Sequence, residues 1–236
     1  MSVSDTQITI MLPALEAYEL WASTYDETPN PLLALEERLL APILSRFTHC
    51  DIVDLGCGTG RWLQRLEATS PRSLAGIDSS AAMLTKAAKK CLPSTALIHA
   101  DCTATTLPAC SADCVHASFL LSYTKDLREF AAEAARILRP LGTLIISDLH
   151  PNTRSYGWRR SFKTAGNLFE IATVSYTIAD ITNMLAHIGF RLEEIHESSF
   201  GEEEEVIFRK NGLLDQFHQV EDLPVVYWAM FSLRKS

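Results

Sequence analysis

The sequence predicts an α/β fold, with a doubly wound, mostly parallel seven-stranded sheet. Short apolar runs alternate with helical patterns along the chain, and a glycine-rich turn joins the first of these runs to a helix. Strands that alternate with helices form βαβ units with right-handed crossovers, which build a parallel sheet. The expected strands are Ile52–Leu55, Ser73–Ile77, Ala96–His99, Cys114–Ser118, Thr143–Ser147, Phe190–His196 and Val225–Leu233.

Apolar residues at helical spacing predict the helices between and around these strands. In the first helix Pro42 interrupts the pattern, so we expect a kink or a break there. The acidic run Glu202–Glu205 is expected to be a loop or the start of a helix. The expected helices are Pro31–Phe47, Gly60–Glu67, Ala81–Lys90, Leu127–Leu138 and Thr177–Ile188.

A chain of 236 residues fits one domain with one core, so we expect a single domain over residues 1–236. Residues 48–150 form its expected core, and residues 1–30 and 150–175 are expected to form a cap or lid. No apolar stretch reaches the length of a membrane span, and the start lacks the layout of a signal peptide. We therefore expect a cytoplasmic protein that does not contact membranes.

Charge and cysteine content argue against a nucleic-acid partner and against a metal site. The formal net charge of −8 argues against a nucleic-acid partner, since such binders carry a basic face. The six cysteines form no C-x-x-C pair and no cluster with zinc spacing. We expect free thiols, with Cys57 and Cys114 in the core, and no metal site. Oligomeric state, monomer or homodimer, stays open.

The run Val53–Gly60, Val-Asp-Leu-Gly-Cys-Gly-Thr-Gly, carries the chemistry. It follows a strand and opens a helix, which is the context that a nucleotide-binding loop requires. Its G-x-G-x-G spacing differs from the G-x-G-x-x-G of dinucleotide loops, because Arg61 stands where the third glycine would fall. The carboxylate of Asp54 would repel a pyrophosphate and attract the ammonium of an amino-acid-like cofactor, directly or through water.

Two more acids follow the next two strands. Asp78 ends the second strand, at the position of an acceptor for ribose hydroxyls. Asp101 follows the third strand, where a carboxylate accepts a hydrogen bond from an exocyclic amine such as that of adenine. Either acid alone is ordinary turn chemistry. Three acids in order at three successive strands, beside the glycine loop, predict a site for an adenosyl amino acid.

The chain resembles the class I S-adenosylmethionine-dependent methyltransferases, in the small-molecule branch related to ubiquinone/menaquinone and malonyl-carrier methyltransferases. The resemblance covers residues 20–150. Besides the glycine run, it rests on Trp21–Asp26, Ala75–Met83, Ala100–Cys102 with Leu107-Pro108, Asp113–Ser118 and Ile137–Ile146. It implies a Rossmann-like methyltransferase fold whose last strand is antiparallel, and S-adenosyl-L-methionine as cofactor with S-adenosyl-L-homocysteine as product.

By this resemblance, Asp54, Gly56 and Gly58 hold the methionine end of the cofactor and Asp78 holds the ribose. Asp101 and Cys102 contact the adenine, and Ser79 and Met83 flank the adenosine. Ser118 and Phe119 line the floor near the sulfonium, and Tyr25 and Cys57 complete the expected cofactor-binding set. Many relatives carry His where Ser122 stands, so a catalytic role at that position is not carried over.

The acceptor pocket is expected from the segments that cover the strand ends. Its expected substrate-binding residues are Tyr18, Trp21, Tyr123, His150, Trp158, Arg159 and Arg160. An arginine there would pair with a carboxylate or phosphate of the substrate; the alternative is a surface loop with Trp158 in the core and solvated arginines. The candidate catalytic groups are His150, Tyr123 and Tyr25. His116 lies inside a strand and is expected to be a hydrogen-bonded core residue.

These features predict an enzyme that transfers a methyl group to O, N or C of a small molecule by in-line displacement. The acceptor is anionic if an arginine of the loop pairs with it. A sulfonium methyl is already activated, so a general base is required only for an acceptor that holds its proton near neutral pH. Three alternatives stay open. They are a cofactor-binding protein without methyl transfer, an enzyme with non-methyl chemistry, and a protein or RNA methyltransferase.

Overall fold

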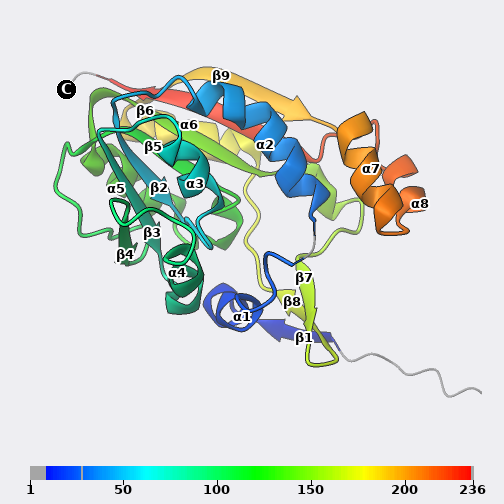
Figure 1. Ribbon diagram of the computed structural model, residues 1–236. Helices are drawn as coiled ribbons and strands as arrows, with labels where there is room; N and C mark the ends of the chain where they lie inside the picture. The colour runs from blue at the N-terminus through cyan, green and yellow to red at the C-terminus, as the bar shows by residue number, and fades with distance from the viewer. Residues whose placement is uncertain (1–8, 28, 235–236) are drawn as a thin grey trace, which may run out of the picture.

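A seven-stranded sheet forms the centre of the computed structural model, which describes residues 9–27 and 29–234 (Figure 1). The strand order is β4-β3-β2-β5-β6-β10-β9, and β10 runs antiparallel to both of its neighbours. The predicted fold class and the antiparallel last strand are therefore confirmed. The strands are β2 (Asp51–Leu55), β3 (Ser73–Asp78), β4 (Ala96–His99), β5 (Ala112–Ser118), β6 (Leu138–Leu149), β9 (Phe190–Ser198) and β10 (Val226–Leu233).

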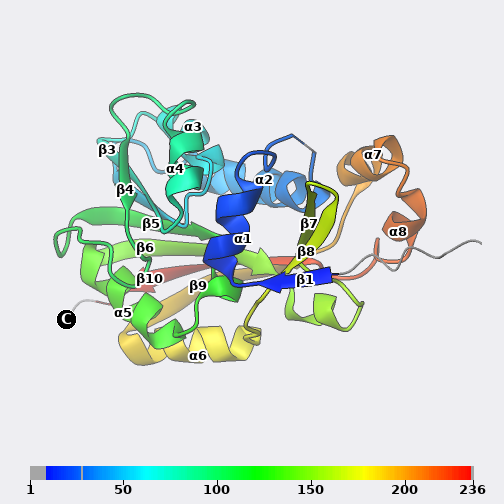
Figure 2. The same cartoon turned by 90° about the horizontal axis from the view of Figure 1, so that it is seen from below.

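Helices cover both faces of the sheet, which Figure 2 shows nearly edge-on. One face carries α2 (Pro31–Leu44), α3 (Arg61–Glu67) and α4 (Ala81–Ala87), and the other carries α5 (Leu127–Ile137) and α6 (Ile178–Ile188). Every residue of β2 is buried, as expected of a central parallel strand covered on both sides. Because β2 runs parallel to β3 and to β5, the carboxyl ends of these strands lie at one edge of the sheet, where the glycine loop begins.

Pro42 does not break α2, which is a single helix, so the predicted break is wrong. Pro42 lies in the last turn of the helix, where few backbone hydrogen bonds remain to be lost. Asn30 caps the start, with its side chain accepting the N–H of Leu32 at 2.9 Å. The acidic run does begin a helix, α7 (Glu202–Lys210), which is followed by α8 (Leu214–His218).

A second, three-stranded sheet was not predicted from the sequence. It joins β1 (Thr9–Leu12) to a hairpin of β7 (Ser161–Thr164) and β8 (Asn167–Ile171). Helix α1 (Ala14–Trp21) follows β1 and lies beside this sheet and near α4 (Figure 1). These elements fall within the two segments expected to form a cap; of those segments, residues 1–8 and 28 lie outside the described residues.

The cysteines at the two expected core positions, Cys57 and Cys114, are buried. His116 is fully buried and hydrogen-bonded, as expected. Within residues 9–27 and 29–234, we find no helix with the length and apolarity to cross a bilayer.

Candidate active site

The glycine run forms a tight loop between β2 and α3. Gly56 and Gly58 adopt φ angles of +70° and +54°, which favour glycine. The amides of Gly56 and Cys57 both donate to the carbonyl of Ile77, at 2.8 and 2.9 Å, and so fix the loop to the end of β3. A Cβ atom at Gly58 would meet no described atom within 4 Å. The backbone there faces open space.

That space is a cavity of about 510 Å³, bounded by the loop, the ends of β3, β4 and β5, and α1. Its volume lies in the range of small-molecule sites. Of the residues predicted for the cofactor or the acceptor, those that line it are Tyr18, Tyr25, Gly56, Cys57, Gly58, Asp78, Ser79, Met83, Asp101, Cys102, Ser118, Phe119 and Tyr123. The structure thus brings most of the predicted site together.

Asp78 fixes the loop to the next turn. One carboxylate oxygen accepts the amide of Gly58 and the other accepts the amide of Ser80, each at 2.8 Å. Burial raises the pKa of Asp78 above its ordinary value, although both backbone hydrogen bonds favour the charged form. Each oxygen retains a lone pair, so the carboxylate can still accept a hydrogen bond from a ligand hydroxyl.

Asp54 lies elsewhere than predicted, because its side chain points to the neighbouring strand. It is 2% exposed, and one carboxylate oxygen lies 2.7 Å from Nδ1 of His116, its partner in the register of β2 and β5. Asp54 is not among the residues that line the cavity. The carboxylate of Asp54 therefore does not face the cavity. The predicted role of Asp54 at the methionine end of the cofactor stays a prediction.

Sequence reasoning missed a buried ion pair under the loop, Glu36 with Arg61. Glu36 is fully buried on α2 and accepts hydrogen bonds from Arg61, from Trp62 Nε1 at 3.1 Å and from Ser118 at 2.6 Å. Burial acts to raise the pKa of Glu36, but the charge of Arg61 and the hydroxyl donors outweigh it and lower the pKa. A signal was present, since Glu36 interrupts the apolar stripe of its helix four residues from Leu32 and from Leu40.

Helix α1 and the turn after it lie over the cavity and are anchored by two carboxylates. Glu19 accepts hydrogen bonds from the Ser80 hydroxyl at 2.8 Å and the Ala82 amide at 3.2 Å. Asp26 accepts a hydrogen bond from the Thr59 hydroxyl at 2.8 Å. The N-terminal segment is thereby attached to the loop and to α4, the elements that border the cavity.

Aromatic rings fill the space between α1 and the cavity. Tyr18 meets Tyr123 edge to face, with ring centroids 5.3 Å apart. Trp21 does not line the cavity; it stacks on Phe162 of the second sheet at 4.8 Å. Burial raises the pKa of Tyr18, Tyr25 and Tyr123, so these phenols stay protonated near neutral pH. They can donate hydrogen bonds there, but they are poor bases.

The sequence left two alternatives for the loop after β6, a substrate-binding lid or a surface loop, and its residues differ in which one they match. Trp158 packs toward Phe200, with ring centroids 6.1 Å apart, and Arg159 is exposed. Arg160 instead places its guanidinium carbon 5.0 Å from the ring centroid of Phe119 and 5.7 Å from that of Tyr123. Both rings line the cavity, so of these three residues Arg160 is the one beside it.

His150 lies away from the cavity and uses both ring nitrogens. Nε2 lies 2.8 Å from a carboxylate oxygen of Glu197, and Nδ1 accepts the amide of Asn152 at 3.2 Å. The ring is 5% exposed. Pro151 leads the chain out of β6 and into the turn Pro151–Arg154. His150 is not among the residues that line the cavity.

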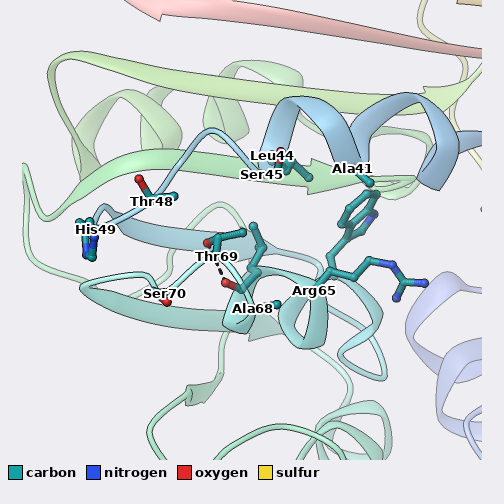
Figure 3. Close-up of a pocket in the computed structure, with 11 residues that line it drawn as sticks. Ala41, Leu44, Ser45, Thr48, His49, Arg65, Ala68, Thr69 and Ser70 are labelled. Atoms are coloured by element: carbon teal, nitrogen blue, oxygen red, sulfur yellow. Dashed lines mark hydrogen bonds between the residues drawn. The ribbon is translucent and has the colours of Figure 1, made fainter.

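A second hollow, of about 570 Å³, lies between the end of α2 and the end of α3 (Figure 3). It is bordered by Leu44, His49, Arg65 and Thr69 among others, and it includes none of the residues predicted for the cofactor or the acceptor. The chemistry predicted from the sequence therefore converges on the cavity beside the glycine loop.

Comparison with known proteins agrees with this fold and with the predicted class of cofactor. Residues 52–142 match a family described as a methyltransferase domain. The chain is 35% identical over 143 residues to a malonyl-[acyl-carrier protein] O-methyltransferase of Hahella chejuensis, covering 58% of this chain and 50% of the relative. It is 36% identical over 126 residues to a trans-aconitate 2-methyltransferase of Klebsiella pneumoniae, covering 50% and 49%. The chain thus spans about half the length of these relatives.

Among solved structures, an S-adenosylmethionine dependent methyltransferase from Mesorhizobium loti has the same fold. Its TM-score is 0.64 at 20% identity, over 81% of this chain and 96% of that one. The glycine run, the acids Asp78 and Asp101 at successive strand ends, the strand order and the matched segment agree with one another. Residues 52–142 thus match a methyltransferase domain, and the chain has the fold of an S-adenosylmethionine-dependent methyltransferase.

Proposed function

We propose that this protein transfers a methyl group from S-adenosylmethionine to a small acidic molecule, whose anionic group is held by Arg160 and Tyr123. The cavity fits the cofactor: open space faces the Gly58 backbone, and Asp78 and Asp101 follow successive strands along its wall. When bound, S-adenosylmethionine supplies a methyl group already activated by the sulfonium. Asp78 would accept the ribose hydroxyls, and Asp101 and Cys102 would lie at the adenine.

One observation carries the acidic acceptor: a buried arginine beside the cavity with unused donors. Among the described residues, Nε and Nη2 of Arg160 have no hydrogen-bond partner, and neither has the hydroxyl of Tyr123. Unpaired buried donors cost free energy, and a charged one costs most. A carboxylate or phosphate would accept from both residues at once.

Asp148 does not serve as that partner. Its nearer oxygen lies 4.0 Å from Arg160 Nη2, beyond hydrogen-bonding distance, and the carboxylate already accepts the amide and hydroxyl of Ser122 at 2.8 and 2.9 Å. Asp148 offsets part of the charge of Arg160 while leaving its donors free. The charge of the guanidinium is therefore balanced well enough for it to stay buried, and Nε and Nη2 can still donate to an anion.

An acidic acceptor also fits a cavity whose described lining includes no histidine to serve as a base near neutral pH. A carboxylate of ordinary pKa, about 4, is ionised at neutral pH and is itself the nucleophile. The chain then has only to bind, orient and exclude water. Arg160 and Tyr123 would fix one anionic group of the acceptor, while the aromatic residues of α1 keep solvent out.

The experiment is a radiolabelled methyl-transfer assay on a panel of small mono-, di- and tricarboxylic acids, with phosphorylated and neutral compounds alongside. We expect label in an acidic acceptor, released as methanol by alkali if a carboxylate oxygen was methylated. Arg160→Met should lower kcat/KM about a hundredfold or more while leaving cofactor affinity unchanged. Arg159→Met removes the same charge one residue away, at an exposed position, and should have little effect. Label only in neutral compounds, or equal losses in the two variants, would contradict the proposal.

A further inference from the structure

Arg61 presents a second guanidinium with an unused buried donor, on the glycine-loop side of the cavity. It is the first residue of α3 and follows the glycine loop directly. Its side chain is 20% exposed and lines the cavity, together with Gly58 and Thr59. Its Nη1 is buried and has no hydrogen-bond partner in the part of the chain that the structure describes.

The other terminal nitrogen of this guanidinium, Nη2, has two acceptors. Nη2 donates to the carboxylate of Glu36 and to the hydroxyl of Ser118, the latter at 3.2 Å. The guanidinium carbon lies 5.0 Å from the ring centroid of Trp62. Glu36 is held in turn by hydroxyl donors from β5 and β6. One side of the guanidinium is therefore fixed, and Nη1 is left without an acceptor.

We infer that Arg61 binds the carboxylate at the amino-acid end of the cofactor, with Glu36 holding the other side of its guanidinium. The inference rests on the proposed function, because it concerns the same cofactor in the same cavity. A carboxylate is the acceptor that matches the paired N–H groups of a guanidinium in both geometry and charge. It would satisfy Nη1, for which the described residues provide no acceptor.

The position of Arg61 indicates that this residue binds the cofactor and not the methyl acceptor. Arg61 adjoins the glycine loop, where the methionine end is expected, whereas Arg160 lies against Phe119 and Tyr123. The side chain, and not the start of α3, carries the assignment, because that helix has only seven residues.

Calorimetric titration with two ligands tests the inference: S-adenosylmethionine, and decarboxylated S-adenosylmethionine, which lacks only the carboxylate. Arg61→Met should weaken binding of the first about tenfold to a hundredfold, as the loss of a charged hydrogen bond does. Binding of the second should change less than about threefold. Arg61→Lys should fall between, because one ammonium cannot serve Glu36 and the ligand as a fixed fork does.

Arg65→Met is the matched control. Arg65 lies one turn further along α3, its guanidinium carbon is 5.9 Å from the same Trp62 ring, and it pairs with Glu37. It borders the other hollow, where Figure 3 shows its guanidinium pointing away from the neighbouring labelled residues. This variant should bind both ligands as the wild type does.

The outcomes separate the two proposals. If wild-type protein binds S-adenosylmethionine and Arg61→Met weakens both ligands equally or neither, the inference is wrong and the proposed function stands. If wild-type protein binds neither ligand, the proposed function fails and the inference fails with it. Should Arg61→Met not fold, as judged by circular dichroism and thermal melting, the same comparison of the two ligands is made with Arg61→Lys.

Discussion

The Asp78 carboxylate accepts the backbone amide of Gly58 at 2.8 Å, so the end of β3 holds the middle of the glycine loop in place. The same residue lines the cavity and was predicted to bind ribose. One side chain therefore shapes the loop and faces the ligand. Its substitution should affect cofactor binding through both contacts.

Asp78→Ala is expected to weaken S-adenosylhomocysteine binding about a hundredfold, because both backbone amides lose their acceptor and the ribose loses its own. Isothermal titration measures the affinity. Asp180→Ala is the control, since Asp180 also accepts backbone and hydroxyl hydrogen bonds at a helix start but lies on α6, outside the residues that line the cavity. Equal affinity of Asp78→Ala and wild type would refute the ribose role.

Gly58→Ala should separate stability from binding. Its φ of +54° makes an L-residue costly, by about 1–2 kcal/mol of unfolding free energy, while the added methyl enters the open space of the cavity. We expect that modest destabilisation together with a cofactor affinity at least about tenfold weaker.

Gly157→Ala provides the comparison for that prediction, since Gly157 has a φ of +82°, open space around a Cβ and a place outside the cavity lining. Chemical denaturation and titration are carried out on both variants. Both should lose similar stability, and only Gly58→Ala should lose affinity. A loss of affinity in both would show that the effect is strain alone.

Glu133 should stabilise the fold in a pH-dependent way. Hydrogen bonds from Arg136 and Thr105 lower the pKa of Glu133 to about 2. An unfolded glutamate has a pKa of about 4.3, so the ionised group stabilises the folded state above that pH. This contribution is lost as the pH falls toward 2.

Glu133→Gln is therefore expected to lower the free energy of unfolding by about 1–3 kcal/mol at pH 7, and the difference from wild type should shrink as the pH falls from about 4 to 2. Urea denaturation across this range measures it. Glu16→Gln removes the same charge at an exposed position of α1 and controls for net charge. A difference in unfolding free energy that does not change with pH would contradict a stabilising ion pair between Glu133 and Arg136.

His150→Gln should leave catalysis intact, because the ring lies outside the cavity lining and both nitrogens are engaged by Glu197 and Asn152. We expect some loss of stability and a methyl-transfer rate per folded molecule within about threefold of wild type. The measurement is the pH profile of kcat. A large fall in kcat of the folded variant across the profile would make His150 the base after all.

The sheet could be predicted from the sequence because its strands are short apolar runs bounded by turn residues. All seven predicted strands occur, and the glycine loop lies between β2 and α3 as its spacing required. The second sheet could not be predicted, because β1 pairs with β8 about 160 residues further along the chain, and pairing at such separation leaves no local pattern.

The cavity wall was predictable for a similar reason, since the carboxyl ends of parallel strands meet at one edge. The sequence did not predict which charged side chains turn toward the cavity. Arg159 and Arg160 are adjacent and alike in sequence, yet one is exposed and the other lies against Phe119 and Tyr123. Glu36 and Arg61 are buried only because α2 and α3 pack together under the loop, which depends on tertiary contacts.

Calorimetric titration of the wild-type chain with S-adenosylhomocysteine is the decisive measurement for a cofactor site at the glycine loop. We predict one-to-one binding that Asp78→Ala weakens about a hundredfold and that Asp180→Ala leaves unchanged. Absence of binding at millimolar ligand by folded wild-type protein would contradict it.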